Sequence, residues 1–128
     1  MKIAVIGCGR WGSFITWYLD HIGHDVTLYG RKNSAHMQQF LKERKNNLLT
    51  LPESVHLTTD LTVVQDAETI IISINSQGLQ KLMEELEQKK LHDKKIVFYN
   101  HIHFPIFLMD FVLLCRYIFY LHHDHLFL

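Results

Sequence analysis

The stretch "KIAVIGCGRWG", Lys2 to Gly12, decides the fold predicted for this chain. Its first half is a short apolar run, which is typical of a strand buried on both faces of a sheet. Its second half places Gly7, Gly9 and Gly12 at the G-x-G-x-x-G spacing, directly before a helical pattern. In that context the spacing predicts a dinucleotide-binding loop, and a simple strand–turn–helix is the alternative.

Each glycine has its own expected role. Gly7 permits a tight turn, Gly9 lets a diphosphate approach the backbone, and Gly12 lets the helix pack closely. The phosphates would then accept hydrogen bonds from amides at the positive end of the helix.

Helical patterns recur along the first 97 residues. We expect the first helix to bury one apolar stripe and to end at Gly23. Asn33 is expected to cap a second helix that runs to about Arg44, and a third helix follows over residues 76–90. The expected inward-facing residues are Trp11, Phe14, Ile15, Tyr18, Leu19 and Ile22 in the first helix, Met37, Phe40 and Leu41 in the second, and Leu79, Leu82, Met83 and Leu86 in the third.

Strand patterns alternate with these helices. They cover residues 2–7, 24–30, 53–60, 69–74 and 94–99, with one or two helical turns over 61–67. Alternating strands and helices imply right-handed crossovers and a mainly parallel sheet. The predicted fold class is α/β, a doubly wound sheet of the Rossmann type, left incomplete by a change in composition near residue 98.

The composition excludes several function classes. The 128 residues carry 13 basic and 13 acidic side chains, so no net charge attracts the chain to nucleic acid. Cys8 and Cys115 are too few for a disulfide framework, and no secretory leader precedes Lys2. We therefore expect a cytoplasmic protein.

The chain divides at residue 97 into a dinucleotide-binding domain, 1–97, and an apolar tail, 98–128. The tail holds nine of the fifteen aromatic residues and five of the ten histidines, but no glycine, lysine or glutamate. We expect it to be irregular or helical.

The end of the second strand, "YGRK", bears on the choice of cofactor. An NAD site usually presents a carboxylate here to the ribose hydroxyls, whereas this chain has Gly30, Arg31 and Lys32. A guanidinium can bind a 2′-phosphate through paired hydrogen bonds, so Arg31 favours NADP over NAD. The alternative is two exposed basic residues at a turn.

Four segments carry a family resemblance: "KIAVIGCGRWGSF", "GHDVTLYGRK", "LTTDL" and "IIISINSQGLQKLM". Over residues 1–97 the chain resembles the N-terminal domain of NAD(P)-dependent glycerol-3-phosphate dehydrogenase. The cofactor contacts that the resemblance implies fall on Gly7, Gly9, Trp11, Gly12, Arg31 and Lys32. Ketopantoate reductase and 6-phosphogluconate dehydrogenase share the glycine loop, but the Trp11–Gly12 pair and "SINSQ" suit them less well.

Two residues depart from the family pattern. Arg10 replaces the usual serine and, as a candidate cofactor contact, would either strengthen the phosphate site or crowd the loop. Asn75 replaces the usual proline, so the turn loses a fixed φ.

The resemblance also implies what is missing. The family's next motif ends in Lys-Gly-Ile-Glu and supplies a catalytic lysine, whereas residues 100–104 read "NHIHF". The family's substrate domain, with a second catalytic lysine, does not fit into the remaining 31 residues. We assign no catalytic residue and expect this chain to bind the cofactor at most. The full-length family interconverts dihydroxyacetone phosphate and sn-glycerol 3-phosphate, a precursor for phospholipid synthesis.

Several hypotheses concern the tail. We favour out-of-frame translation of an A/T-rich gene, so that the chain is a truncated dehydrogenase. A membrane anchor over Phe104–Leu121 would contain Asp110 and Arg116, which disfavour insertion. The "HIH" and "HHDH" motifs offer metal-ligand types without an evident fixed geometry, so no metal site is predicted. A non-catalytic NADPH-binding module and a membrane-tethered Rossmann domain are the alternative functions.

Overall fold

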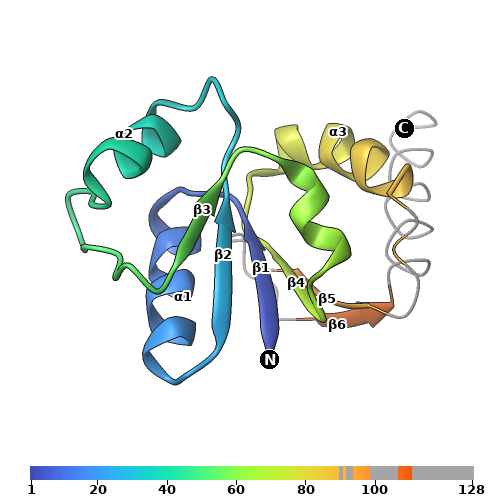
Figure 1. Cartoon of the computed structure of the whole chain (residues 1–128). Helices are drawn as coiled ribbons and strands as arrows, with labels where there is room; N and C mark the ends of the chain where they lie inside the picture. The colour runs from blue at the N-terminus through green and yellow to red at the C-terminus, as the bar shows by residue number, and fades with distance from the viewer. Residues whose placement is uncertain (90, 92–93, 99–106, 111–128) are drawn as a thin grey trace.

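The computed structural model of the chain describes residues 1–89, 91, 94–98 and 107–110 (Figure 1). These residues form a six-stranded sheet in the order β3-β2-β1-β4-β5-β6, with helices on both faces. The elements in chain order are β1 (Lys2–Ile6), α1 (Arg10–His21), β2 (Asp25–Tyr29), α2 (Ala35–Glu43), β3 (His56–Thr58), the 3-10 helix η1 (Leu61–Gln65), β4 (Thr69–Ile72), α3 (Ser76–Glu87), β5 (Lys95–Phe98) and β6 (Phe107–Asp110).

The first five strands are parallel, as predicted for a Rossmann-type sheet. From β1 the chain moves outward through β2 to β3, and it then returns to place β4 and β5 on the other side of β1. The order therefore reverses between β1 and β4. In open α/β sheets, ligands bind at such a switch point, outside the carboxyl ends of the strands.

The last strand differs from the prediction. The tail was expected to be irregular or helical, but Phe107–Asp110 forms β6, which runs antiparallel to β5 with Phe107 opposite Phe98 and Asp110 opposite Lys95. The physical reason is the open edge of β5, whose backbone donors and acceptors need partners that a returning extended segment supplies. The rest of the tail lies outside the described residues.

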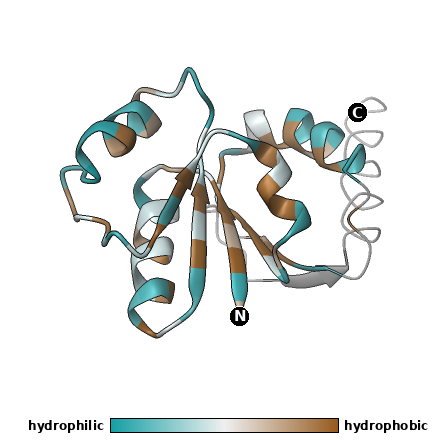
Figure 2. Cartoon of the chain, in the orientation of Figure 1, coloured by the Kyte–Doolittle hydropathy of each residue, from teal (hydrophilic) through white to brown (hydrophobic). Residues whose placement is uncertain are grey.

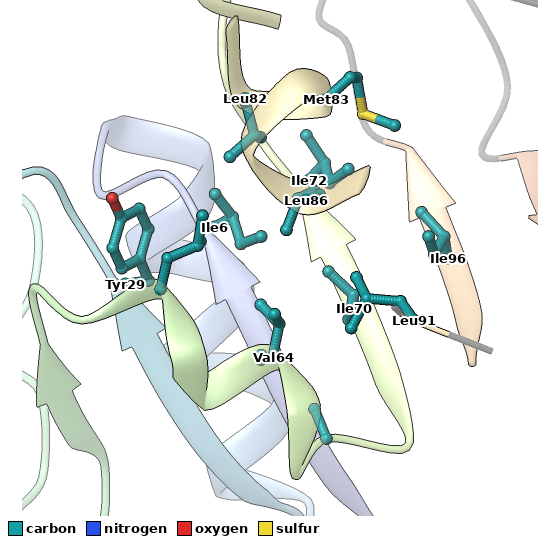
Figure 3. Packing of buried hydrophobic residues seen from close by; sticks show 13 residues of the cluster. Ile6, Tyr29, Val64, Ile70, Ile72, Leu82, Met83, Leu86, Leu91 and Ile96 are labelled. Atoms are coloured by element: carbon teal, nitrogen blue, oxygen red, sulfur yellow. The ribbon is translucent and has the colours of Figure 1, made fainter. Parts of the chain in front are cut away.

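Each face of the sheet has its own apolar core. One core packs α3 and η1 against the sheet (Figure 3), and the strands that form it are apolar along most of their length (Figure 2). The second core packs α1 and α2 against the opposite face. The α3 stripe is buried as predicted: Leu82, Met83 and Leu86 are at most 5% exposed, and Leu79 is partly buried. The doubly wound arrangement is confirmed.

Helix α1 presents a different face to the sheet from the one predicted. Of the expected stripe, Ile15 and Leu19 pack against the core, whereas Trp11, Phe14, Tyr18 and Ile22 are exposed. Gly12, Ser13 and Thr16 are buried instead. The cause is a close approach, because a Cβ on Gly12 would lie 1.8 Å from the carbonyl oxygen of Gly7. At that separation only small side chains fit beneath the start of the helix.

Helix α2 differs from the prediction at two positions. Ser34, rather than Asn33, is the N-cap, and its hydroxyl accepts a hydrogen bond from the amide of Met37 at 3.3 Å. Met37 and Phe40 are fully buried as predicted, but Leu41 is 44% exposed. Leu41 is exposed because it lies about 100° around the helix from Phe40, which faces the core.

Within the described residues, no helix is long and apolar enough to cross a membrane. The hypothetical anchor over Phe104–Leu121 falls outside them except for β6.

Candidate cofactor-binding site

A cleft of about 340 Å³ opens at the switch point of the sheet. Its walls come from the loop between β1 and α1, the turn between β2 and α2, and the segment that joins β4 to α3. These three segments follow the carboxyl ends of neighbouring parallel strands, where a Rossmann-type sheet binds its ligand.

Gly7 and Gly12 fix the shape of the first wall. Gly7 has φ +113°, and its amide donates to the carbonyl of Tyr29 at 3.0 Å. A Cβ on Gly7 would lie 2.0 Å from the carbonyl oxygen of Ser73, and one on Gly12 would lie 1.8 Å from that of Gly7. Both positions therefore require glycine to pack the loop between neighbouring strands. These packing roles agree with the sequence expectation.

Gly9 differs from the other two glycines, because a Cβ there would meet nothing within 4 Å. It is the N-cap of α1 and provides no side chain to accept hydrogen bonds from the first-turn amides. The loop thus leaves open space at the positive end of a twelve-residue helix, which suits an anionic group such as a diphosphate.

Arg10 and Trp11 lie outside this cleft. Both line a separate apolar depression on the outer side of α1, together with Phe14, Trp17 and Leu48. The two predicted contacts are therefore placed apart from Gly7, Gly9 and Arg31, which share the cleft. A role for Arg10 or Trp11 in cofactor binding stays a prediction.

The turn after β2 separates the two predicted basic contacts. Arg31 lines the cleft, whereas Lys32 does not. The amide of Ser34 donates to the carbonyl of Arg31 at 3.0 Å, and the side-chain amide of Gln38 donates to the carbonyl of Lys32 at 2.6 Å. Hydrogen bonds from Ser34 and Gln38 therefore hold the turn against the start of α2.

Cys8 forms part of the cleft wall and is a buried free thiol. Its sulfur lies 3.6 Å from the hydroxyl of Ser34, and burial raises the pKa of the Cys8 thiol above its ordinary value. The thiol therefore stays protonated at neutral pH and leaves the wall uncharged. Burial also raises the pKa of Tyr29, which lines the same cleft.

Several cleft residues were missed by the sequence reasoning: Tyr29, Asn33, Ser34, His36, Ser73 and Ile74. Ser73 and Ile74 follow β4 directly. Their position in the cleft could have been predicted from the sequence, because the carboxyl ends of adjacent parallel strands meet at one edge of the sheet. His36 gave no signal of its own, since its position depends on where α2 begins.

Asn75 keeps the backbone conformation of the proline expected there and adds a helix cap. Its φ of −71° lies in the range that proline imposes. As the N-cap of α3, its side chain also accepts a hydrogen bond from the amide of Gly78 at 3.0 Å. The departure from the family pattern therefore leaves the start of α3 intact.

No group of three His, Cys, Asp or Glu side chains that could hold a metal ion occurs in the part of the chain that the structure describes. The "HIH" and "HHDH" motifs and Cys115 lie outside that part.

A parallel sheet with a glycine loop at its switch point defines the class of Rossmann-type nucleotide-binding domains. The family described as "NAD-dependent glycerol-3-phosphate dehydrogenase N-terminus" matches residues 2–100. The chain therefore belongs to the glycerol-3-phosphate dehydrogenase family and corresponds to its N-terminal domain.

Individual relatives agree with this assignment. A glycerol-3-phosphate dehydrogenase (NAD(P)+) from a Thermoanaerobacter species is 31% identical over 104 residues, which cover 78% of this chain and 31% of that protein. Its Exiguobacterium counterpart is 38% identical over 94 residues, which cover 66% of this chain and 26% of that protein. The chain thus spans about a third or less of these relatives.

Solved structures show the same fold. The glycerol-3-phosphate dehydrogenase of Coxiella burnetii has a TM-score of 0.68 at 22% identity, over 76% of this chain and 31% of that one. The enzyme from Saccharomyces cerevisiae has a TM-score of 0.67 at 19% identity, over 77% of this chain and 33% of that one.

Proposed function

We propose that this chain binds a nicotinamide dinucleotide, with the diphosphate on the Gly7–Gly12 loop. The observation that carries the proposal is the open space at Gly9, at the start of α1 and at the switch point of the sheet. The names of the relatives, glycerol-3-phosphate dehydrogenase (NAD(P)+), support the choice of cofactor.

We also propose a preference for NADP. Arg31 lines the cleft at the end of β2, and the described lining residues include no aspartate or glutamate. A carboxylate at this position would hydrogen-bond the two ribose hydroxyls of NAD and repel a 2′-phosphate. The guanidinium has the opposite preference.

Turnover is a separate question. We propose that the family reaction is the NAD(P)H-dependent reduction of dihydroxyacetone phosphate to glycerol 3-phosphate, and that this chain alone does not catalyse it. The chain spans only 31% of the Thermoanaerobacter relative, so most of that protein's residues have no counterpart here. The proposal includes a cytoplasmic location, for which the low cysteine content of the chain is the supporting observation.

Replacing Arg31 tests cofactor choice. Arg31→Asp should weaken NADPH binding by about tenfold or more, because it removes a charge-assisted hydrogen bond and introduces repulsion. NADH affinity should be kept or should rise, since the new carboxylate can accept hydrogen bonds from the two ribose hydroxyls. Titration of the purified chain with each cofactor, followed by NAD(P)H fluorescence, measures both values.

Lys42→Asp is the matched control, because Lys42 lies in the last turn of α2 and does not line the cleft. It should leave both affinities unchanged. Equal losses of NADPH and NADH in Arg31→Asp would remove Arg31 from its assigned role. Oxidation of NADPH by the chain with dihydroxyacetone phosphate would contradict the proposed lack of turnover.

A further inference from the structure

The cleft contains a second basic side chain that differs from the one expected. Sequence similarity pointed to Arg31 and Lys32 as a pair, but the cleft is lined by Arg31 and His36. His36 is the second residue of α2, and it is exposed, as are Arg31 and Lys32.

Two hydrogen bonds hold the turn that places His36, rather than Lys32, in the cleft wall. The carbonyl of Arg31 accepts from the amide of Ser34, which closes a tight turn between β2 and α2. The carbonyl of Lys32 accepts from the side chain of Gln38 at 2.6 Å, which fixes that residue's backbone against the outside of the helix. The start of α2 therefore lines the cleft together with Arg31, whereas Lys32 does not line it.

The orientation of α2 is fixed from its buried side. Met37 and Phe40 are fully buried in the core under the helix. The cap from Ser34 to the amide of Met37 sets where the first turn begins. Because the first turn of α2 is anchored in this way, the backbone of His36 is held at the rim of the cleft, which its side chain lines.

The charge of this rim selects the ligand. Arg31 and His36 are its basic side chains, Asn33 and Ser34 add polar groups, and no carboxylate occurs among the described lining residues. A phosphate monoester has three acceptor oxygens and a charge near −2, so it can accept from two basic groups at once. A ribose diol offers weaker acceptors and no charge.

We propose that His36, rather than Lys32, is the partner of Arg31 in binding the 2′-phosphate of the adenosine moiety. Arg31 approaches the phosphate from the end of β2, and His36 approaches it from the first turn of α2. The inference rests on the proposed dinucleotide binding and adds a specificity residue to it.

The experiment uses adenosine 2′,5′-bisphosphate and adenosine 5′-monophosphate as probes, because they differ only in the 2′-phosphate. Calorimetric titration of the full chain and its His36→Ala variant measures both affinities. His36→Ala should weaken the bisphosphate about three- to fivefold, because it removes a solvent-exposed hydrogen-bond donor to the charged phosphate. The affinity for the monophosphate should not change.

Three further variants make the test specific. Lys32→Ala should weaken the bisphosphate less than His36→Ala does, and Lys42→Ala should have no effect. His36→Lys should keep the bisphosphate affinity at least within about twofold, because the lysine ammonium also donates hydrogen bonds to phosphate. All three positions are exposed or at the helix surface, so the far-ultraviolet spectrum and the melting temperature should be preserved.

Two results would overturn the inference: a larger loss in Lys32→Ala than in His36→Ala, or an equal loss of both probes in His36→Ala. If the unaltered chain bound neither these probes nor NADPH, the proposed dinucleotide binding would itself be wrong. The two failures are therefore distinguishable.

Discussion

Helices α1 and α3 have the same length and cover opposite faces of the sheet, but the side chains that they bury most deeply differ in size. In α3 the apolar stripe faces the sheet, with Leu86 fully buried and Leu82 3% exposed. In α1 small residues such as Thr16 face the sheet, and Phe14 and Tyr18 are 47% and 49% exposed.

The difference follows from how each helix begins. The start of α1 lies against the glycine loop, where a Cβ on Gly12 would be 1.8 Å from a backbone oxygen. The start of α3 has more room, since a Cβ on Gly78 would be 3.5 Å from the side chain of Asn75, an ordinary contact. A helix that must lie close to the backbone buries small residues, whereas a helix held at side-chain distance buries leucine and methionine.

Gly12→Val tests the close approach and has the largest expected effect. The new side chain would overlap the Gly7 carbonyl, so the backbone has to move. We expect a loss of more than about 4 kcal/mol in the free energy of unfolding, which is exceptional for one substitution. Urea unfolding followed by circular dichroism measures it.

Gly9→Ala is the matched control, because the site has open space and an ordinary φ of −73°. It should leave the free energy of unfolding within about 0.5 kcal/mol of the unaltered chain. Its effect should appear as weaker NADPH binding. If Gly12→Val were as stable as Gly9→Ala, the close approach would not determine the face of α1.

Leu86→Ala tests the other side of the comparison. Leu86 is fully buried in the core beneath α3. Removing its side chain should cost about 2–4 kcal/mol, from lost burial and from the cavity that remains. The midpoint of urea unfolding should fall, with an unchanged dependence on denaturant.

Phe14→Ala removes a larger side chain from α1 and should cost much less. Phe14 contacts Trp11 edge-on with 6.4 Å between ring centroids, and it stacks on Trp17 at 6.2 Å. Because nearly half of its surface is exposed, we expect less than about 1 kcal/mol. A cost equal to that of Leu86→Ala would show that the aromatic face of α1 is buried.

Thr16→Val tests one buried hydrogen bond on the sheet-facing side of α1, and its expected effect is far smaller than that of Gly12→Val or Leu86→Ala. Thr16 is fully buried, and its hydroxyl donates to the carbonyl of Gly12 at 2.8 Å. Valine keeps the shape but loses this bond, so the free energy of unfolding should fall by about 1 kcal/mol. Thr16→Ser keeps the hydroxyl and separates the hydrogen bond from the packing. An unchanged stability in Thr16→Val would mean that packing alone holds this face of α1.

Most of the fold could be predicted because it depends on local patterns. The strand Thr69–Ile72 is recognised from a continuous apolar run, and α3 is recognised from apolar residues that recur every three or four positions. In both elements the residues of the pattern are the ones that pack in the core. The face of α1 could not be predicted, since its apolar period competes with a contact to Gly7 that is formed only in the folded chain.

Some residues of the candidate site could be predicted from the sequence, and others could not. Gly7, Gly9 and Arg31 were found from spacing and from their place after a strand, and the structure brings all three to one cleft. Lys32 is adjacent to Arg31 in the sequence but does not line that cleft, and His36 does. Proximity in the chain does not predict which side chains share a surface across a turn.

By itself the sequence determined the parallel α/β sheet, the glycine loop and the family, because strand and helix periods and the loop spacing are properties of neighbouring residues. Only the tertiary structure decided which face α1 buries, that β6 pairs antiparallel with β5, and that His36 lies with Arg31. Those features depend on distances between segments far apart in the chain, and the packing of backbone against backbone sets such distances.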